Sequence, residues 1–144
     1  MTNQKNPQSA DTPEKQLLVL RIIWGALLFG ECLFLTVALL VIIPKQPKPN
    51  QPQAILQWLS LGMAATIIPA VFMFRLLLLN KAREIGAVNT QTTSSANIIF
   101  WAGCEGVAFF GIVAAIINAS AWPTFICPAA AILCQLGTFP KAEA

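Results

Sequence analysis

The sequence predicts an all-α protein, an integral membrane four-helix bundle that forms one domain and divides naturally into two helical hairpins. Two observations lead to this fold class. Hydrophobic residues make up 56% of the chain and charged residues only 10%. Soluble domains have about 45–50% hydrophobic and about 25% charged residues. Four apolar stretches are also each long enough to cross a bilayer core of about 30 Å as a helix. Too few charges remain to cover a water-facing surface.

The first 53 residues predict a polar tail, a long helix and an exposed loop. Residues 1–16 are rich in Asn, Gln, Lys and Pro, so we expect a flexible cytoplasmic tail. The first transmembrane helix is predicted over about 17–43, with Arg21 reaching the headgroups. This apolar run is too long for a cleaved signal peptide. Residues 44–53 contain four prolines, which prevent a helix and predict an extended loop.

The second and third helices are predicted over about 54–79 and 97–117. Each has the length and composition of a membrane span. Pro69 lies inside the second helix, where proline usually bends a membrane helix. The intervening residues 80–96 are polar and predict a loop.

The fourth helix, predicted over about 121–139, has the weakest signal. It contains Pro123, Pro128 and Gln135, yet its 19 or so residues are just enough to span a bilayer. The link of residues 118–121 is very short and predicts a tight hairpin with the third helix. The membrane domain therefore covers residues 17–139.

The distribution of basic residues predicts the orientation of the helices. With the N-terminus in the cytoplasm, the outer side has only Lys45 and Lys48, and both termini, including a short tail of residues 140–144, face inward. We expect a multi-pass protein of the bacterial cytoplasmic (inner) membrane in this orientation, because inner loops are enriched in Lys and Arg. Trp24 and Trp101 are then expected near the inner interface, and Trp58 and Trp122 near the outer one. The seven inner basic residues are Lys5, Lys15, Arg21, Arg75, Lys81, Arg83 and Lys141.

The missing residue types argue against most enzymatic chemistry. The chain has no His and no Tyr, so it cannot supply a haem-ligating His, a His-ligated zinc site or a Ser-His-Asp triad. Its four Cys have no zinc-type spacing and lie in apolar stretches, as structural Cys usually do. We therefore expect a protein that is not an enzyme and has no cofactor and no metal site. Its scattered basic residues do not predict nucleic-acid binding.

Two acids inside the apolar stretches are the candidate functional residues. Glu31 lies near the centre of the first predicted helix and Glu105 near the centre of the third, so both carboxyls are expected at a similar depth. A carboxylate in hydrocarbon costs about 2.5–3.5 kcal/mol on insertion scales. One interpretation is a proton- or cation-binding site. The other is a protonated Glu that hydrogen-bonds a neighbouring helix and sets the packing. The two acids could also share one proton.

Small residues and prolines around these acids predict close helix contacts. Small side chains let two helix backbones approach, and Ala102 and Gly106 form a small-xxx-small pair. Further glycines flank both acids, and the second helix offers small residues to face them. The residues predicted to serve helix packing are Gly25, Gly30, Gly62, Pro69, Ala102, Gly103, Gly106, Gly111 and Pro128.

The third predicted helix resembles a known family. The run from Glu105 to Ile117, with an acid followed by aliphatic residues and a Phe-Gly pair, is similar to the carboxylate helix of the ring-forming proteolipid (c-type) subunits of rotary ATPases. The preceding polar loop around Lys81 and Arg83 also resembles theirs. The resemblance implies that Glu105 would be the ion-carrying acid. The second helix departs from the family, because it has only Gly62 where those subunits have closely spaced glycines. Over its whole length the chain resembles small, uncharacterised four-helix membrane proteins of bacteria.

The sequence thus favours a non-enzymatic structural or accessory component of a membrane complex. The alternative is a proton- or cation-linked transport component that uses Glu31 and Glu105. The expected partners are the lipid bilayer and either further copies of the chain, in a homo-oligomer, or other subunits of a larger membrane complex.

Overall fold

The computed structural model describes residues 13–48, 54–84 and 90–140, and the regular structure within these ranges is entirely helical. The predicted all-α class with four helices is confirmed for this part of the chain. Most of the two predicted tails, and part of the loop after the first helix, lie outside the described residues. The helices are α1 (Pro13–Val37), α2 (Ala54–Glu84), α3 (Thr90–Ile117) and α4 (Ile126–Gly137), and α1 continues through a π-helical turn, η1 (Ala38–Ile42), into a 3-10 turn, η2 (Ile43–Lys45).

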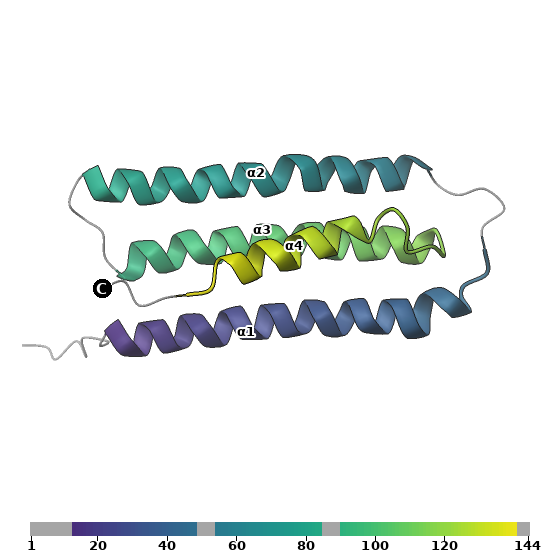
Figure 1. The fold of residues 1–144 in the computed structure, drawn as a ribbon, viewed down its shortest axis with the longest axis horizontal. Helices are drawn as coiled ribbons and strands as arrows, with labels where there is room; N and C mark the ends of the chain where they lie inside the picture. The colour runs from purple at the N-terminus through teal and green to yellow at the C-terminus, as the bar shows by residue number, and fades with distance from the viewer. Residues whose placement is uncertain (1–12, 49–53, 85–89, 141–144) are drawn as a thin grey trace, which may run out of the picture.

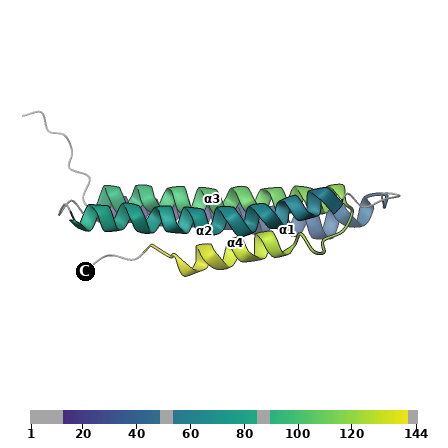
Figure 2. The same cartoon turned by 90° about the horizontal axis from the view of Figure 1, so that it is seen from above.

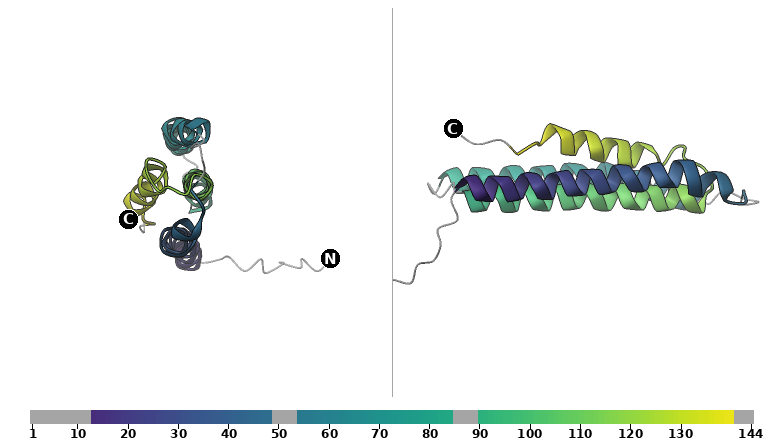
Figure 3. Two further views of the ribbon diagram at one scale, coloured as in Figure 1. Left: turned by 90° about the vertical axis from the view of Figure 1, so that its right-hand side faces the viewer. Right: turned by 90° about the horizontal axis from the view of Figure 1, so that it is seen from below.

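Helix α3 is the centre of the molecule. Helices α1 and α2 flank it on opposite sides, and α4 lies on one face of the row that these three helices form (Figures 1 and 3). Helices α1 and α3 run in one direction, and α2 and α4 run in the other (Figure 1). Seen from above, α4 lies below this row (Figure 2). As a result, one long face of α3 is covered by α4 while its opposite face is left without a helix.

Three helices are long and apolar enough to cross a membrane, namely the segments Glu14–Lys45, Ala54–Glu84 and Thr92–Ile117. Helix α2 continues to Glu84 and α3 begins at Thr90, so much of the loop predicted over 80–96 is helical. The polar residues of 80–84 and 90–96 include no Gly or Pro to end a helix. Lys81 and Arg83 also stabilise the last turn of α2, because their positive charges interact favourably with the negative, C-terminal end of the helix dipole.

The fourth helix is shorter than predicted. Helix α4 has 12 residues, which gives a length of about 18 Å against a bilayer core of about 30 Å. Residues before it form turns, with the Phe125 amide donating to the Ala121 carbonyl at 2.8 Å. The position of Pro128 explains where α4 begins. Proline is tolerated in the first helical turn, where the backbone N–H lacks a helical partner in any case, and Pro128 is the third residue of α4.

The core lies where α1 and α4 meet the covered face of α3. Side chains of α3 dominate it, and Trp101 and Cys104 are completely buried. Leu20 of α1 and Ala131 of α4 complete the central cluster. The α3 contribution to this cluster is Phe100, Trp101, Cys104 and Ala108.

Candidate functional site

The buried acid Glu31 is paired with an amide from the far end of the chain. The Nε2 of Gln135 on α4 donates a hydrogen bond to Oε2 of Glu31 on α1, at 2.8 Å. Glu31 is 1% exposed and Gln135 is 0% exposed. Sequence reasoning identified Glu31 as intramembrane but did not identify this partner. The available signal was that Gln135 is an amide within the fourth apolar stretch.

The end of α4 is held against α1 by further contacts around this pair. The indole Nε1 of Trp24 donates to the main-chain carbonyl of Gln135 at 3.0 Å. The same indole packs edge-on against Phe139, with ring centroids 5.0 Å apart. Nε of Arg21 donates to the Pro140 carbonyl at 3.3 Å, and its guanidinium lies 5.5 Å from the centre of the Phe139 ring. Gln135 is therefore fixed by its main chain as well as by its side chain.

Helix α3 supports the pair from the other side. The indole Nε1 of Trp101 donates to the hydroxyl of Thr138 at 2.9 Å, and that hydroxyl donates in turn to the Cys134 carbonyl at 3.1 Å. Trp101 is 0% exposed, so it is a core residue rather than the interfacial anchor that the sequence suggested. The completely buried Cys104 of α3 also lies near Glu31.

The second acid, Glu105, lies near the pair but is not bonded to Glu31. The two acids are on the parallel helices α1 and α3, and the nearby contact between Phe34 and Phe109, with ring centroids 5.2 Å apart, shows that they lie at a similar level. Glu105 is only half-buried. The structure therefore brings the two acids to the same region but gives Glu31 an amide partner from α4.

Two oxygen atoms in this site have no hydrogen-bond partner. Among the described residues, the buried side-chain polar atoms left unpartnered are Oε1 of Glu31 and Oε1 of Gln135. They belong to the same two side chains that share the 2.8 Å hydrogen bond. Buried polar atoms in native proteins are nearly always bonded, so this coincidence needs a chemical explanation.

Three of the predicted packing residues lie at close helix contacts or in the core. A Cβ atom at Gly103 would lie 2.7 Å from Cγ1 of Val71 on α2, and one at Gly111 would lie 2.6 Å from Cβ of Cys127 on α4. Pro128 is buried in the first turn of α4. Gly103 and Gly111 therefore let α2 and α4, respectively, approach α3.

The other predicted packing residues have open surroundings within the chain. A Cβ atom at Gly25, Gly30, Gly62 or Gly106 would meet nothing within 4 Å. Pro69 and Ala102 are exposed. The expected contact between the small residues of α2 and Glu105 is also not formed, because the side of α3 that faces α2 carries Gly103 and not the acid.

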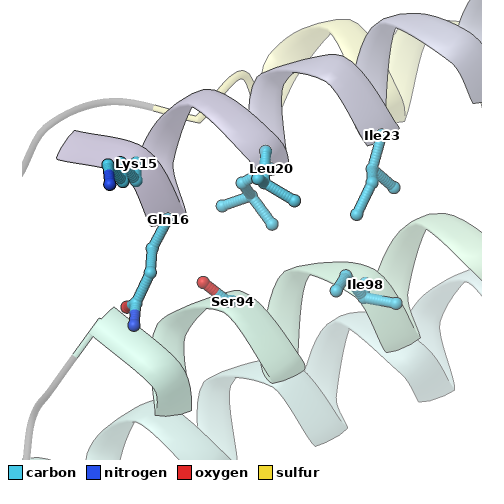
Figure 4. A pocket seen from close by; sticks show the side chains of 7 residues that line it. Lys15, Gln16, Leu20, Ile23, Ser94 and Ile98 are labelled. Carbon is cyan, nitrogen blue, oxygen red and sulfur yellow. The ribbon is translucent and has the colours of Figure 1, made fainter. Parts of the chain in front are cut away.

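A groove of about 420 Å³ lies between the first turns of α1 and the start of α3 (Figure 4). Its polar lining residues are Lys15, Gln16 and Ser94, and its apolar ones include Leu20 and Ile98. Figure 4 shows the polar side chains at one end and the apolar ones further along the helices.

The four cysteines are free thiols at separate positions. Cys127 donates to the Ser60 carbonyl at 3.4 Å, which links α4 to α2. Within the described ranges, His, Cys, Asp and Glu side chains form no group of three or more that could hold a metal ion. Comparisons of the chain with protein-family models, with curated proteins and with solved structures found no match.

Proposed function

We propose that this chain is a non-enzymatic structural or accessory subunit of a membrane complex, inserted in the bacterial cytoplasmic membrane with both termini inside. The observation that carries the proposal is the open face of α3. This face consists of exposed residues spaced three or four apart along the central helix, and no helix lies over it, although Phe109 at its edge contacts Phe34 of α1 (Figure 3). Its members are Ser95, Ile99, Ala102, Gly106, Phe109 and Val113.

The exposed apolar surface supports membrane insertion. Large apolar side chains are exposed along α2, among them Trp58 at 73%, Leu77 at 62% and Met73 at 57%. Soluble proteins rarely leave apolar patches larger than a few hundred Å² in water. In a bilayer such surface is solvated by acyl chains, and helices whose backbone groups bond internally are the structures that can cross it.

The arrangement of the helix ends supports a single topology. The start of α1, the end of α2, the start of α3 and the end of the described chain after α4 all lie at one end of the molecule (Figure 1). Lys81 and Arg83 are at this end, and Lys45 and Lys48 are at the other. The positive-inside rule then places the first end in the cytoplasm.

Cysteine labelling tests this topology. In a variant whose native cysteines are replaced, a membrane-impermeant thiol reagent added to intact cells should label Lys48→Cys but not Glu143→Cys. Labelling of position 143 from outside would contradict the proposed orientation.

The open face of α3 supports a partner helix there. Ala102 and Gly106 are small, and nothing within the chain approaches Gly106. Spacing of this kind allows close helix packing in membranes. Glu105 lies next to Ala102 and Phe109 on the helix surface and is half-buried, so a partner on this face would cover its exposed part. Covering an acid in this way removes it from lipid, where it is costly.

The assembly can be tested with two matched variants. Gly106→Leu adds a large side chain to the open face, whereas Gly62→Leu makes the same change on α2, and neither position is crowded within the chain. In mild detergent we expect the native chain to purify as a homo-oligomer or with partner subunits, Gly106→Leu to lose the assembly, and Gly62→Leu to keep it. A native chain that is monomeric and purifies alone would refute the proposal.

Proton- or cation-linked transport is the second candidate function. It is favoured by the position of Glu31 and Glu105, which lie at a similar level on the parallel helices α1 and α3. In proteoliposomes, this function predicts that Glu31→Gln and Glu105→Gln each abolish proton or sodium flux while the protein stays folded. Unchanged flux in both variants would remove this candidate.

A further inference from the structure

The two unpartnered oxygens of the acid-amide pair have one economical explanation. An ionised carboxylate only accepts hydrogen bonds, and an amide oxygen also only accepts. Oε1 of Glu31 and Oε1 of Gln135 therefore cannot satisfy each other while Glu31 is ionised. A proton on Glu31 changes this, because a protonated carboxyl has one O–H donor.

The ring N–H donors of the neighbouring tryptophans, and Nε of Arg21, donate to other groups. Nε1 of Trp24 donates to the main-chain carbonyl of Gln135, and Nε1 of Trp101 donates to the hydroxyl of Thr138. Nε of Arg21 donates to the main-chain carbonyl of Pro140. The other titratable groups around the pair are Cys104 and Glu105 on α3 and Cys134 on α4. Arg75, in the apolar part of α2, bonds Asn97 of α3 at 2.8 Å.

We propose that Glu31 is a proton-binding site in which the neutral carboxyl and the Gln135 amide form a closed ring of two hydrogen bonds. The amide Nε2 donates to Oε2 of Glu31 at 2.8 Å, as the structure shows, and the proton on Oε1 of Glu31 is donated to Oε1 of Gln135. The ring satisfies both buried oxygens with one proton. If the Gln135 amide were rotated by 180°, so that its oxygen took the place of Nε2, that oxygen would lie 2.8 Å from Oε2 of Glu31. Both atoms are acceptors, so a proton on the carboxyl would again be required between them.

A metal cation fits this site less well than a proton. Hard cations take about six to eight oxygen ligands, and the pair offers two unpartnered oxygens. The Gln135 amide also directs its N–H towards the carboxyl, which opposes a cation there. The inferred ligand is therefore a proton.

Proton binding at Glu31 would control the docking of α4. The hydrogen bond to Gln135 joins α1 to α4 inside the bundle, next to the buried residues Cys104 and Trp101. Loss of the proton would remove one of the two bonds and leave a negative charge facing an amide oxygen. The contact between α4 and α1 should therefore weaken as pH rises through the ionisation of Glu31. This inference does not depend on the proposed subunit role.

Infrared spectroscopy of the whole purified protein in lipid tests the proton directly. A protonated carboxyl has a C=O stretching band that an ionised carboxylate lacks. At neutral pH we expect this band in the native protein and in Glu105→Gln, and its loss in Glu31→Gln. In Gln135→Leu the band should remain but shift to higher frequency, because the C=O of the protonated Glu31 carboxyl no longer accepts a hydrogen bond from the amide at position 135. A native spectrum in which Glu31→Gln removes no such band would overturn the proposal.

The pH dependence of unfolding gives a second readout. Two amides can form the same ring of two hydrogen bonds, so Glu31→Gln should keep α4 docked with no proton to lose. The resistance of the native protein to unfolding by SDS should fall as pH rises, and that of Glu31→Gln should stay level over the same range. Equal pH profiles would refute the inference, as would a native infrared band that disappears when sodium replaces potassium at constant ionic strength.

Discussion

The close approach of α3 and α4 at Gly111 gives a quantitative prediction. A Cβ atom there would lie 2.6 Å from Cβ of Cys127, 3.1 Å from Cδ of Pro128 and 3.1 Å from the Thr124 carbonyl oxygen. None of these atoms is the end of a flexible side chain, so Gly111→Ala must push the start of α4 away from α3. Gly106→Ala is the matched control, because a Cβ atom at Gly106 meets nothing within 4 Å.

The expected effects of these two variants have opposite signs. Overpacking of a core costs about 1–3 kcal/mol, and replacing a helical glycine by alanine contributes about 0.5–1 kcal/mol of stability. Gly111→Ala should therefore destabilise the fold by up to about 2.5 kcal/mol, while Gly106→Ala should stabilise it by about 0.5–1 kcal/mol.

SDS titration of the chain, first dissociated to monomers by a harsher detergent than the one that preserves the assembly, and followed by Trp fluorescence, measures both changes. Working with the monomer keeps any effect on the open face of α3 out of the comparison. Equal stability changes at the two positions would refute the inferred contact between α3 and α4. Gly111→Ala more stable than the native protein would refute it as well.

Two further contacts can be tested in the same assay. Gly103→Ala should destabilise the fold because its Cβ atom would lie 2.7 Å from Cγ1 of Val71, and Val71→Ala should relieve most of that cost of about 1–3 kcal/mol; the absence of any rescue would contradict the contact. Trp101→Phe should cost at least about 1 kcal/mol, because it removes the 2.9 Å hydrogen bond to Thr138 and leaves part of a completely buried site unfilled. Thr138→Val should then add little to it, and fully additive losses would show that the two side chains act separately.

Local rules account for most of the helical segments. Apolar length and the lack of charge predicted four helices, and the described residues form four α-helices, three of which belong to segments long and apolar enough to cross a membrane. The error at the fourth helix has a local cause. Pro128 lies in the first turn of α4, where proline is best tolerated, and α4 begins at Ile126 and not near residue 121. Pro69 in the interior of α2 shows that a proline alone does not fix a helix boundary in this chain.

Which helix faces meet is not encoded by the same local rules. In a soluble helix an apolar stripe marks the buried face, but a membrane helix is apolar all round, because lipid is as apolar as the core. Gly103 and Gly106 therefore look equivalent in the sequence. Only the packing shows that one lies against Val71 while the other faces open space.

The candidate site divides in the same way. The sequence by itself determined that Glu31 and Glu105 lie in apolar helices, because a charge in hydrocarbon is rare and costly whatever the fold. Only the tertiary structure decided that Glu31 meets Gln135, a residue 104 positions away, while Glu105 stays half-buried beside the open face of α3. The physical reason is that hydrogen bonds between helices depend on how each helix is rotated and shifted, and these are set by the steric fit of small residues such as Gly111 against α4.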